Sequence, residues 1–154
     1  MSQFVHLRAH SQYSFVDGLL SPKDLVAMAA ADGQEAIALT DNQRMFGTIE
    51  FYKAARDKGV KPIIGLDTLV DADITRAGQD TAPVRLLLLA KDESGYRRLM
   101  ELVSRSYTEN KVNGVARIKQ SWLAEDASGL VALSGGEDGE IAQDLLTRAG
   151  ADVQ

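Results

Sequence analysis

The sequence predicts an α/β fold that contains parallel strand–helix units, and two observations support this prediction. Short apolar runs of strand length alternate with longer segments in which apolar residues recur at helical spacing. The order strand, helix, strand, helix, strand at the start of the chain is typical of parallel β/α units. With 154 residues, the chain is long enough for one domain with a hydrophobic core.

The first half of the chain contains clear helix boundaries. Ser21 is a good N-cap, Pro22 fits the first helical position, and Gly33 and Gly59 are typical helix stops. In the first helix, the residues expected to face inward are Leu25, Val26, Met28 and Ala29. The expected elements are a buried strand over 4–7, a helix over about 22–32, a buried strand over 35–40, a helix over about 46–58 and a strand over 60–70.

The second half continues the alternation of strands and helices. In the helix over about 93–107, Leu99, Leu102, Val103 and Ser106 are at helical spacing and are expected to form one face, which Tyr96 joins. Trp122 is expected to anchor packing, whereas Arg97, Arg98 and Arg105 are expected to form a solvated helix face. The expected elements are a loop or hairpin tip over 71–82, a strand over 83–90 that pairs with the strand over 60–70, a helix over about 93–107, a short helix over 119–123, a strand over 129–134 and a helix over about 138–148.

The composition excludes several classes of function. The net charge of −5 and the pI of about 5.0 argue against a chain that binds a phosphate backbone by itself. The absence of cysteine excludes disulfides, thiolate zinc sites and cysteine nucleophiles. No apolar run approaches the length of a membrane span, and the N-terminal residues lack the charged-then-apolar pattern of a secretion signal. We therefore expect a cytoplasmic protein with no membrane partner.

Side chains that can bind metal follow the predicted strands. His10 and Asp17 follow the first strand, Asp41 follows the second, and Asp67 lies near the end of the third. Strand ends of successive β/α units converge at one end of a sheet or barrel. Imidazole and carboxylate groups there could hold divalent ions that activate water in a phosphoesterase. Alternatively, these residues are helix caps and turn formers, and their spacing alone leaves both interpretations open.

The chain resembles the polymerase and histidinol phosphatase (PHP) domain at the N-terminus of bacterial DNA polymerase III alpha subunits, of the proteobacterial type. The resemblance implies a (β/α)7-like barrel, of which residues 1–154 would form the N-terminal portion with about the first four β/α units. The remainder would belong to a much longer polymerase chain. The segments that carry the resemblance are 4–14 with 17–18, 39–42 with 45–47, 50–52, 59–65, 95–99 and 133–136.

The same resemblance implies a degenerate metal site. Metal-binding members carry His-x-His in the opening motif, and its two positions fall on Arg8 and His10 here. Asn42 stands where these members have a further ligand histidine, and Asp67 stands at the position of a later glutamate of the family. Arg8 brings a permanent positive charge that could pair with Asp17, Asp41 or Asp67 and take the place of the metal as the local counter-charge. The candidate site residues are His10, Asp17, Asp41 and Asp67, with Arg8 and Asn42 at lost ligand positions.

The resemblance also implies a role without catalysis in this piece. The parent chain would be a DNA-directed DNA polymerase with magnesium in its polymerase module, and this piece would be a scaffold that helps hold the proofreading exonuclease subunit. Other replisome subunits are further expected partners, and DNA would bind through the rest of the parent chain. No cofactor is expected in this fragment. The alternative that stays open is that the degenerate site still binds zinc, manganese or magnesium.

Two further expectations concern the isolated piece. The alternative function is a free-standing metal-dependent PHP phosphoesterase, in which the retained ligands would still hold ions. An open half-barrel would expose strand edges and a large apolar surface, so the fragment is also expected to self-associate.

Overall fold

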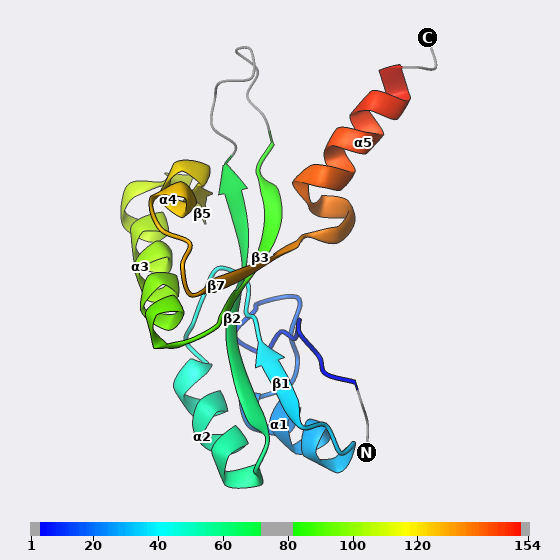
Figure 1. Cartoon of the computed structure of the whole chain (residues 1–154), viewed down its shortest axis with the longest axis vertical. Helices are drawn as coiled ribbons and strands as arrows, with labels where there is room; N and C mark the ends of the chain where they lie inside the picture. Colours follow the sequence, from blue (N-terminus) through cyan, green and yellow to red (C-terminus); the bar gives the residue numbers. More distant parts are fainter. Residues whose placement is uncertain (1–3, 72–81, 152–154) are drawn as a thin grey trace.

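A central sheet with helices around it forms the fold (Figure 1). The computed structural model describes residues 4–71 and 82–151. None of the helices in these ranges is long and apolar enough to cross a membrane. In chain order, the elements are α1 (Pro22–Ala31), β1 (Ala36–Leu39), α2 (Thr48–Lys58), β2 (Lys61–Asp71), β3 (Val84–Ala90), α3 (Glu93–Glu109), β4 (Lys111–Val112), β5 (Val115–Ala116), β6 (Ile118–Lys119), α4 (Gln120–Glu125), β7 (Leu130–Ser134), a 3-10 turn (Gly136–Asp138) and α5 (Glu140–Ala151).

The sheet combines parallel and antiparallel pairing. The strand order is β1-β2-β3-β7, and β6 pairs with the end of β2. The first part of β2 runs parallel to β1, as predicted, and its second part pairs antiparallel with β3. The predicted pairing of β3 with β2 is therefore confirmed, and β7 joins β3 in the antiparallel sense. The tip of the predicted loop over 71–82 lies outside the described residues.

The opening segment is not the buried strand that was predicted. Within the described residues 4–10, one isolated bridge joins His6 to Ile37 in parallel register, and Ala38 N donates to His6 O at 2.8 Å. Phe4 and Leu7 are exposed, so the apolar run does not enter the core. The segment nevertheless runs beside β1, which is why the residues that follow it reach the sheet.

The helix signals in the sequence are confirmed, with one error in the buried face. Ser21 Oγ accepts a hydrogen bond from Asp24 N and caps α1. Gly33 and Gly59 adopt positive φ values of 72° and 71°, which favour glycine. Val26 is fully buried in α1, but Met28, which was expected to face inward, is exposed.

The two largest apolar clusters among the described residues lie between the sheet and the helices. In Figure 1, α1 and α2 lie at the lower end of the sheet, whereas α3 and α4 lie along one side of its upper part. The first cluster contains Val26, Ala29, Ile37, Leu39, Phe51, Ala55 and Val60. The second contains Leu66, Val70, Leu88, Leu99, Leu102, Ile118 and Trp122, as the amphipathic pattern of α3 predicted.

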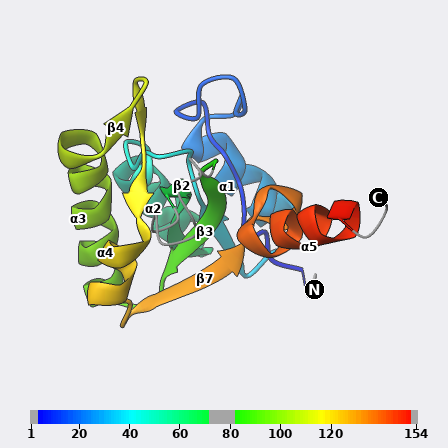
Figure 2. The same cartoon turned by 90° about the horizontal axis from the view of Figure 1, so that it is seen from above.

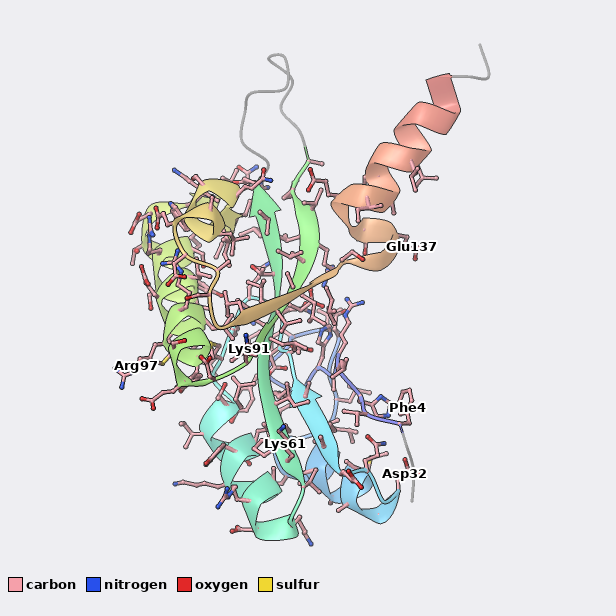
Figure 3. The ribbon with its side chains drawn as sticks, viewed as in Figure 1. Phe4, Asp32, Lys61, Lys91, Arg97 and Glu137 are labelled. Atoms are coloured by element: carbon pink, nitrogen blue, oxygen red, sulfur yellow. The ribbon has the colours of Figure 1, made fainter. Side chains whose placement is uncertain are left out.

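The predicted solvated arginine face of α3 is correct for only one of its three residues. Arg97 points outward (Figure 3) and pairs with Glu93 on the same helix. Arg98 is nearly buried and donates to the carbonyl of Trp122. The Arg105 guanidinium lies 4.3 Å from the centre of the Trp122 ring. The two inner arginines therefore join α3 to α4.

Candidate functional site

A buried carboxylate, Asp67, lies at the centre of the candidate site. Its Oδ2 accepts a hydrogen bond from Arg8 Nε at 2.8 Å and lies 3.1 Å from His10 Nε2. Its Oδ1 forms an ion pair with Arg85 Nη1 at 3.1 Å. The side chain of Asp67 is completely buried, so these groups enclose it. We call Arg8, His10, Asp67 and Arg85 the Asp67 cluster.

The charges around Asp67 keep it ionised. Burial by itself would raise the pKa of this carboxyl group. The His10 hydrogen bond and the positive charges of Arg85 and Arg8 outweigh burial, and the pKa falls below its usual value of 3.8. The group at the centre of the site is therefore an anion at neutral pH, and its counter-charges are guanidinium groups.

Backbone pairing explains why these residues meet. Ala9 O accepts from Thr40 N at 2.9 Å, which places the segment that carries Arg8 and His10 beside the end of β1. Beyond β1, Asn42 forms a parallel bridge with Asp67 on β2. The sheet therefore brings three chain segments to one place, as strand order predicts for β/α units.

Asp41 is a buried residue that ties a loop together and does not belong to the Asp67 cluster. Its Oδ1 accepts from Ser11 N at 2.6 Å and from Ser14 Oγ at 2.7 Å, and its Oδ2 accepts from Ser11 Oγ at 2.8 Å. All three side chains are buried. These bonds match the interpretation of Asp41 as a turn former better than its interpretation as a metal ligand.

Asn42 and Asp17 form the outer part of the site. Asn42 Nδ2 donates to Asp17 Oδ2 at 2.5 Å, and Asn42 Oδ1 accepts from Arg85 Nη1 at 3.0 Å. Arg85 thus contacts both the amide of Asn42 and the carboxylate of Asp67. Its Nε also lies 3.9 Å from Asp138 Oδ2 in the 3-10 turn. The guanidinium of Arg85 therefore connects β3 with three other parts of the chain.

The site opens into a pocket of about 450 Å³, lined by Arg8, His10, Asp17, Arg85 and Asp138. Its residues do not fit a divalent metal ion. Across residues 4–71 and 82–151, no three His, Asp or Glu side chains gather closely enough to hold one. Metal sites of this kind use carboxylate and imidazole donors, whereas Arg8 and Arg85 offer only donors and a permanent positive charge.

The sequence predicted part of this arrangement. Arg8 was expected to pair with Asp17, Asp41 or Asp67, and the structure places it on Asp67. The role of Arg85 was not predicted, although a single charge inside the apolar run 83–90 was an available signal. The serines that bind Asp41 were also not predicted, because their pairing spans about thirty residues and no local pattern indicates it.

Comparisons with known proteins agree with the fold. A solved structure of an amidohydrolase from Chromobacterium violaceum, with bound sulfate and no metal, aligns with a TM-score of 0.52 and 26% identity, over 68% of this chain and 33% of that one. This similarity supports the predicted α/β class and is consistent with the first part of a barrel.

Sequence comparisons assign the family. DNA polymerase III subunit alpha from Pseudomonas aeruginosa is 43% identical over 143 residues, which cover 93% of this chain and 12% of the relative. Those from Vibrio cholerae and Escherichia coli K12 are 42% and 40% identical, each over 94% of this chain and 12% of the relative. The chain thus spans about 12% of the length of these curated relatives. The family model of the PHP domain matches residues 6–153, and the chain belongs to the PHP domain family.

Proposed function

We propose that this chain is the N-terminal PHP portion of a DNA polymerase III alpha subunit, and that the whole protein performs DNA-templated DNA synthesis. The observation that carries the proposal is the similarity to alpha subunits along almost the whole chain. Because the chain spans only a small part of these relatives, nucleotidyl transfer and its magnesium ions would belong to the rest of the protein. DNA would also bind there, since this chain is acidic.

Within that protein, the Asp67 cluster has a structural role. Asp67 on β2 pairs with Arg8 of the opening segment and with Arg85 of β3. The cluster therefore joins three segments that are distant in the sequence. A phosphoesterase site would instead need ions at this position, and two guanidinium groups already neutralise the carboxylate. We infer that the PHP portion is a scaffold without catalytic residues.

The partners follow from the same proposal. Each relative is a subunit of a DNA polymerase, so partner subunits are expected. We propose that the PHP portion helps hold the proofreading exonuclease subunit and contacts other replisome subunits in the cytoplasm.

The polymerase proposal is tested with the longer protein that carries this chain. The purified protein should extend a primer on a DNA template when magnesium and all four deoxynucleotides are present. Failure of primer extension would contradict the proposal. Binding of the exonuclease subunit is measured separately, because the scaffold role can fail while synthesis remains.

The scaffold proposal is tested at the site itself. Elemental analysis should find no tightly bound zinc, manganese or magnesium in the PHP portion, and added manganese should not produce phosphodiester hydrolysis. If ions were bound, and if Asp67→Asn abolished hydrolysis, the free-standing phosphoesterase would be favoured.

The double substitution Arg8→His with Asn42→His should raise affinity for zinc or manganese, because imidazoles would return to both lost ligand positions. No gain in bound metal would contradict the idea of a degenerate site.

A further inference from the structure

Asn113 differs from the other two asparagines of the chain in its neighbour and in its contacts. It alone is followed by glycine. The amide of Asn42 donates to Asp17 at 2.5 Å, and the amide of Asn110 donates to Asp71 at 2.9 Å. Among the residues that the structure describes, the side chain of Asn113 has no hydrogen-bond partner. Asparagine is one of the thermolabile residue types, and a free amide next to glycine is the arrangement that favours its loss of ammonia.

Asn113 and its neighbour Gly114 form the turn of the β4–β5 hairpin. The two strands pair antiparallel, with Val112 opposite Val115, so two residues connect them. The φ values of Asn113 and Gly114 are 51° and 83°, both positive, as in a type I′ turn. Both residues are exposed, and a Cβ atom added at Gly114 would meet nothing within 4 Å. The described residues therefore do not crowd the backbone at Gly114.

The β4–β5 hairpin is short and lies at the surface. Each of its strands has two residues, and residues 111–115 are all exposed. In Figure 2, the chain leaves α3, passes through β4 to a tip that projects beyond the sheet, and returns toward α4. A two-stranded hairpin with so few pairs is marginally stable, and such segments open at a lower free energy than the rest of a fold. The turn at Asn113 therefore opens while the body of the molecule stays folded.

The closed turn protects Asn113, because it holds the reacting atoms apart. Loss of ammonia by ring closure needs the backbone nitrogen of Gly114 beside the side chain of Asn113. In the left-handed region that Asn113 occupies, ψ is about +30° to +60°, which places that nitrogen nearly opposite the Asn113 Cβ. Opening of the hairpin frees ψ and allows the two groups to meet. The free energy of hairpin opening therefore controls the rate of the reaction.

We propose that Asn113 is a spontaneous modification site, which forms a cyclic succinimide with Gly114 when the hairpin opens and is then hydrolysed to isoaspartate and aspartate. The Gly114 nitrogen loses its proton to solvent and forms a bond to Asn113 Cγ. The bond from Cγ to Nδ2 breaks, and Nδ2 takes up a proton and leaves as ammonia. Water, the only co-reactant, then cleaves one of the two ring bonds to the Gly114 nitrogen. Cleavage at the backbone carbonyl gives isoaspartate, and cleavage at Cγ gives aspartate.

Isoaspartate at this position breaks the turn but not the fold around it. It adds a methylene group to the backbone and one negative charge, and it lengthens a connection that type I′ geometry limits to two residues. The pairing of Val112 with Val115 is therefore lost. At the base of the hairpin, Arg117 N donates to Asn110 O at 3.0 Å, and the buried Ile118 pairs with β2. These contacts confine the change to the hairpin.

The test follows the longer protein that carries this chain during incubation in mildly alkaline buffer. Peptide mass spectrometry with electron-transfer fragmentation distinguishes isoaspartate from aspartate at position 113. A synthetic peptide of residues 109–119 is the reference for an open turn. The proposal expects isoaspartate at position 113 in the protein, formed at least about threefold more slowly than in the peptide. Asn42 and Asn110 are internal controls and should remain unmodified.

Two variants separate the ring chemistry from the protection by the hairpin. Asn113→Gln keeps a side-chain amide but would need a larger ring, so position 113 should stay unmodified while the unaltered protein reacts. Val115→Gly weakens β5 without altering the reacting atoms, and the rate should rise at least about twofold toward that of the peptide. Val115 is exposed enough that its loss leaves the core intact.

Three results would overturn the proposal. The first is the absence of isoaspartate at position 113 when the peptide is fully converted. The second is aspartate without isoaspartate, which would indicate direct hydrolysis of the amide in place of the ring. The third is a rate in the protein that equals the rate in the peptide, or that Val115→Gly leaves unchanged, because either would show that the hairpin does not protect Asn113.

Discussion

Replacing Asp67 by asparagine should lower the free energy of unfolding of this chain by about 2–3 kcal/mol at pH 7. The substitution removes the negative charge and leaves two guanidinium groups and His10 without their shared counter-charge. Loss of one partner from a fully buried ion pair costs about 3–5 kcal/mol. We use a smaller value because water screens part of the interaction: the Arg8 side chain is 49% exposed and that of Arg85 is 25% exposed.

The pH dependence follows from the lowered pKa of Asp67. A carboxyl group whose pKa is lower in the folded than in the unfolded state stabilises the fold above its unfolded pKa. That stabilisation is present above the usual value of 3.8 and is lost as the pH falls through the folded pKa. The difference in stability between the unaltered chain and Asp67→Asn should therefore be constant near neutrality and shrink in acid below pH 3.8.

Urea unfolding followed by the fluorescence of Trp122 is the assay, because this buried residue is the only tryptophan in the chain. Asp57→Asn on the exposed face of α2 is the matched control, since it makes the same chemical change without a buried partner. The control should change stability by less than about 0.5 kcal/mol. An equal effect of the two substitutions would refute the reasoning, as would a difference that does not shrink in acid.

Three further substitutions test the loop over residues 11–20, which precedes α1, by thermal and urea unfolding. Gly18→Ala should destabilise the chain by about 2–4 kcal/mol, because the new Cβ would overlap Ser11 O, and a neutral effect would contradict this close packing. Val16→Asn should stabilise it by about 1 kcal/mol, since asparagine accepts positive φ more easily, and a loss of stability would argue against backbone strain. Ser14→Ala should destabilise it by about 1–2 kcal/mol by removing a donor to buried Asp41, whereas no change would show that this hydrogen bond contributes little.

The parts of the fold that were predictable depend on neighbours in the sequence. Ser21 with Pro22 predicted where α1 begins, and Gly59 predicted where α2 ends, because caps and positive φ are local requirements. The helical spacing of Leu99 and Leu102 predicted the buried face of α3. Each of these signals lies within one or two helical turns of the structure that it predicts.

The parts that were not predictable depend on segments that meet only after folding. Phe4 was expected to be buried because it belongs to an apolar run, but the sheet pairs with that segment by a single isolated bridge. The choice of Asp67 as the partner of Arg8 requires β1 and β2 to be in place. Arg85 joins the site because β3 returns antiparallel to β2, a register that follows from tertiary packing.

The length of β2 has a consequence for how the molecule unfolds. Ile64 packs against the first apolar cluster, whereas Leu66 and Val70, further along the same strand, belong to the second. Neither cluster can lose its strand without loosening the other, because the eleven residues of β2 form one continuous element. The two halves should therefore behave as a single cooperative unit, in which amide hydrogens of β1 exchange with the same opening free energy as those near Trp122.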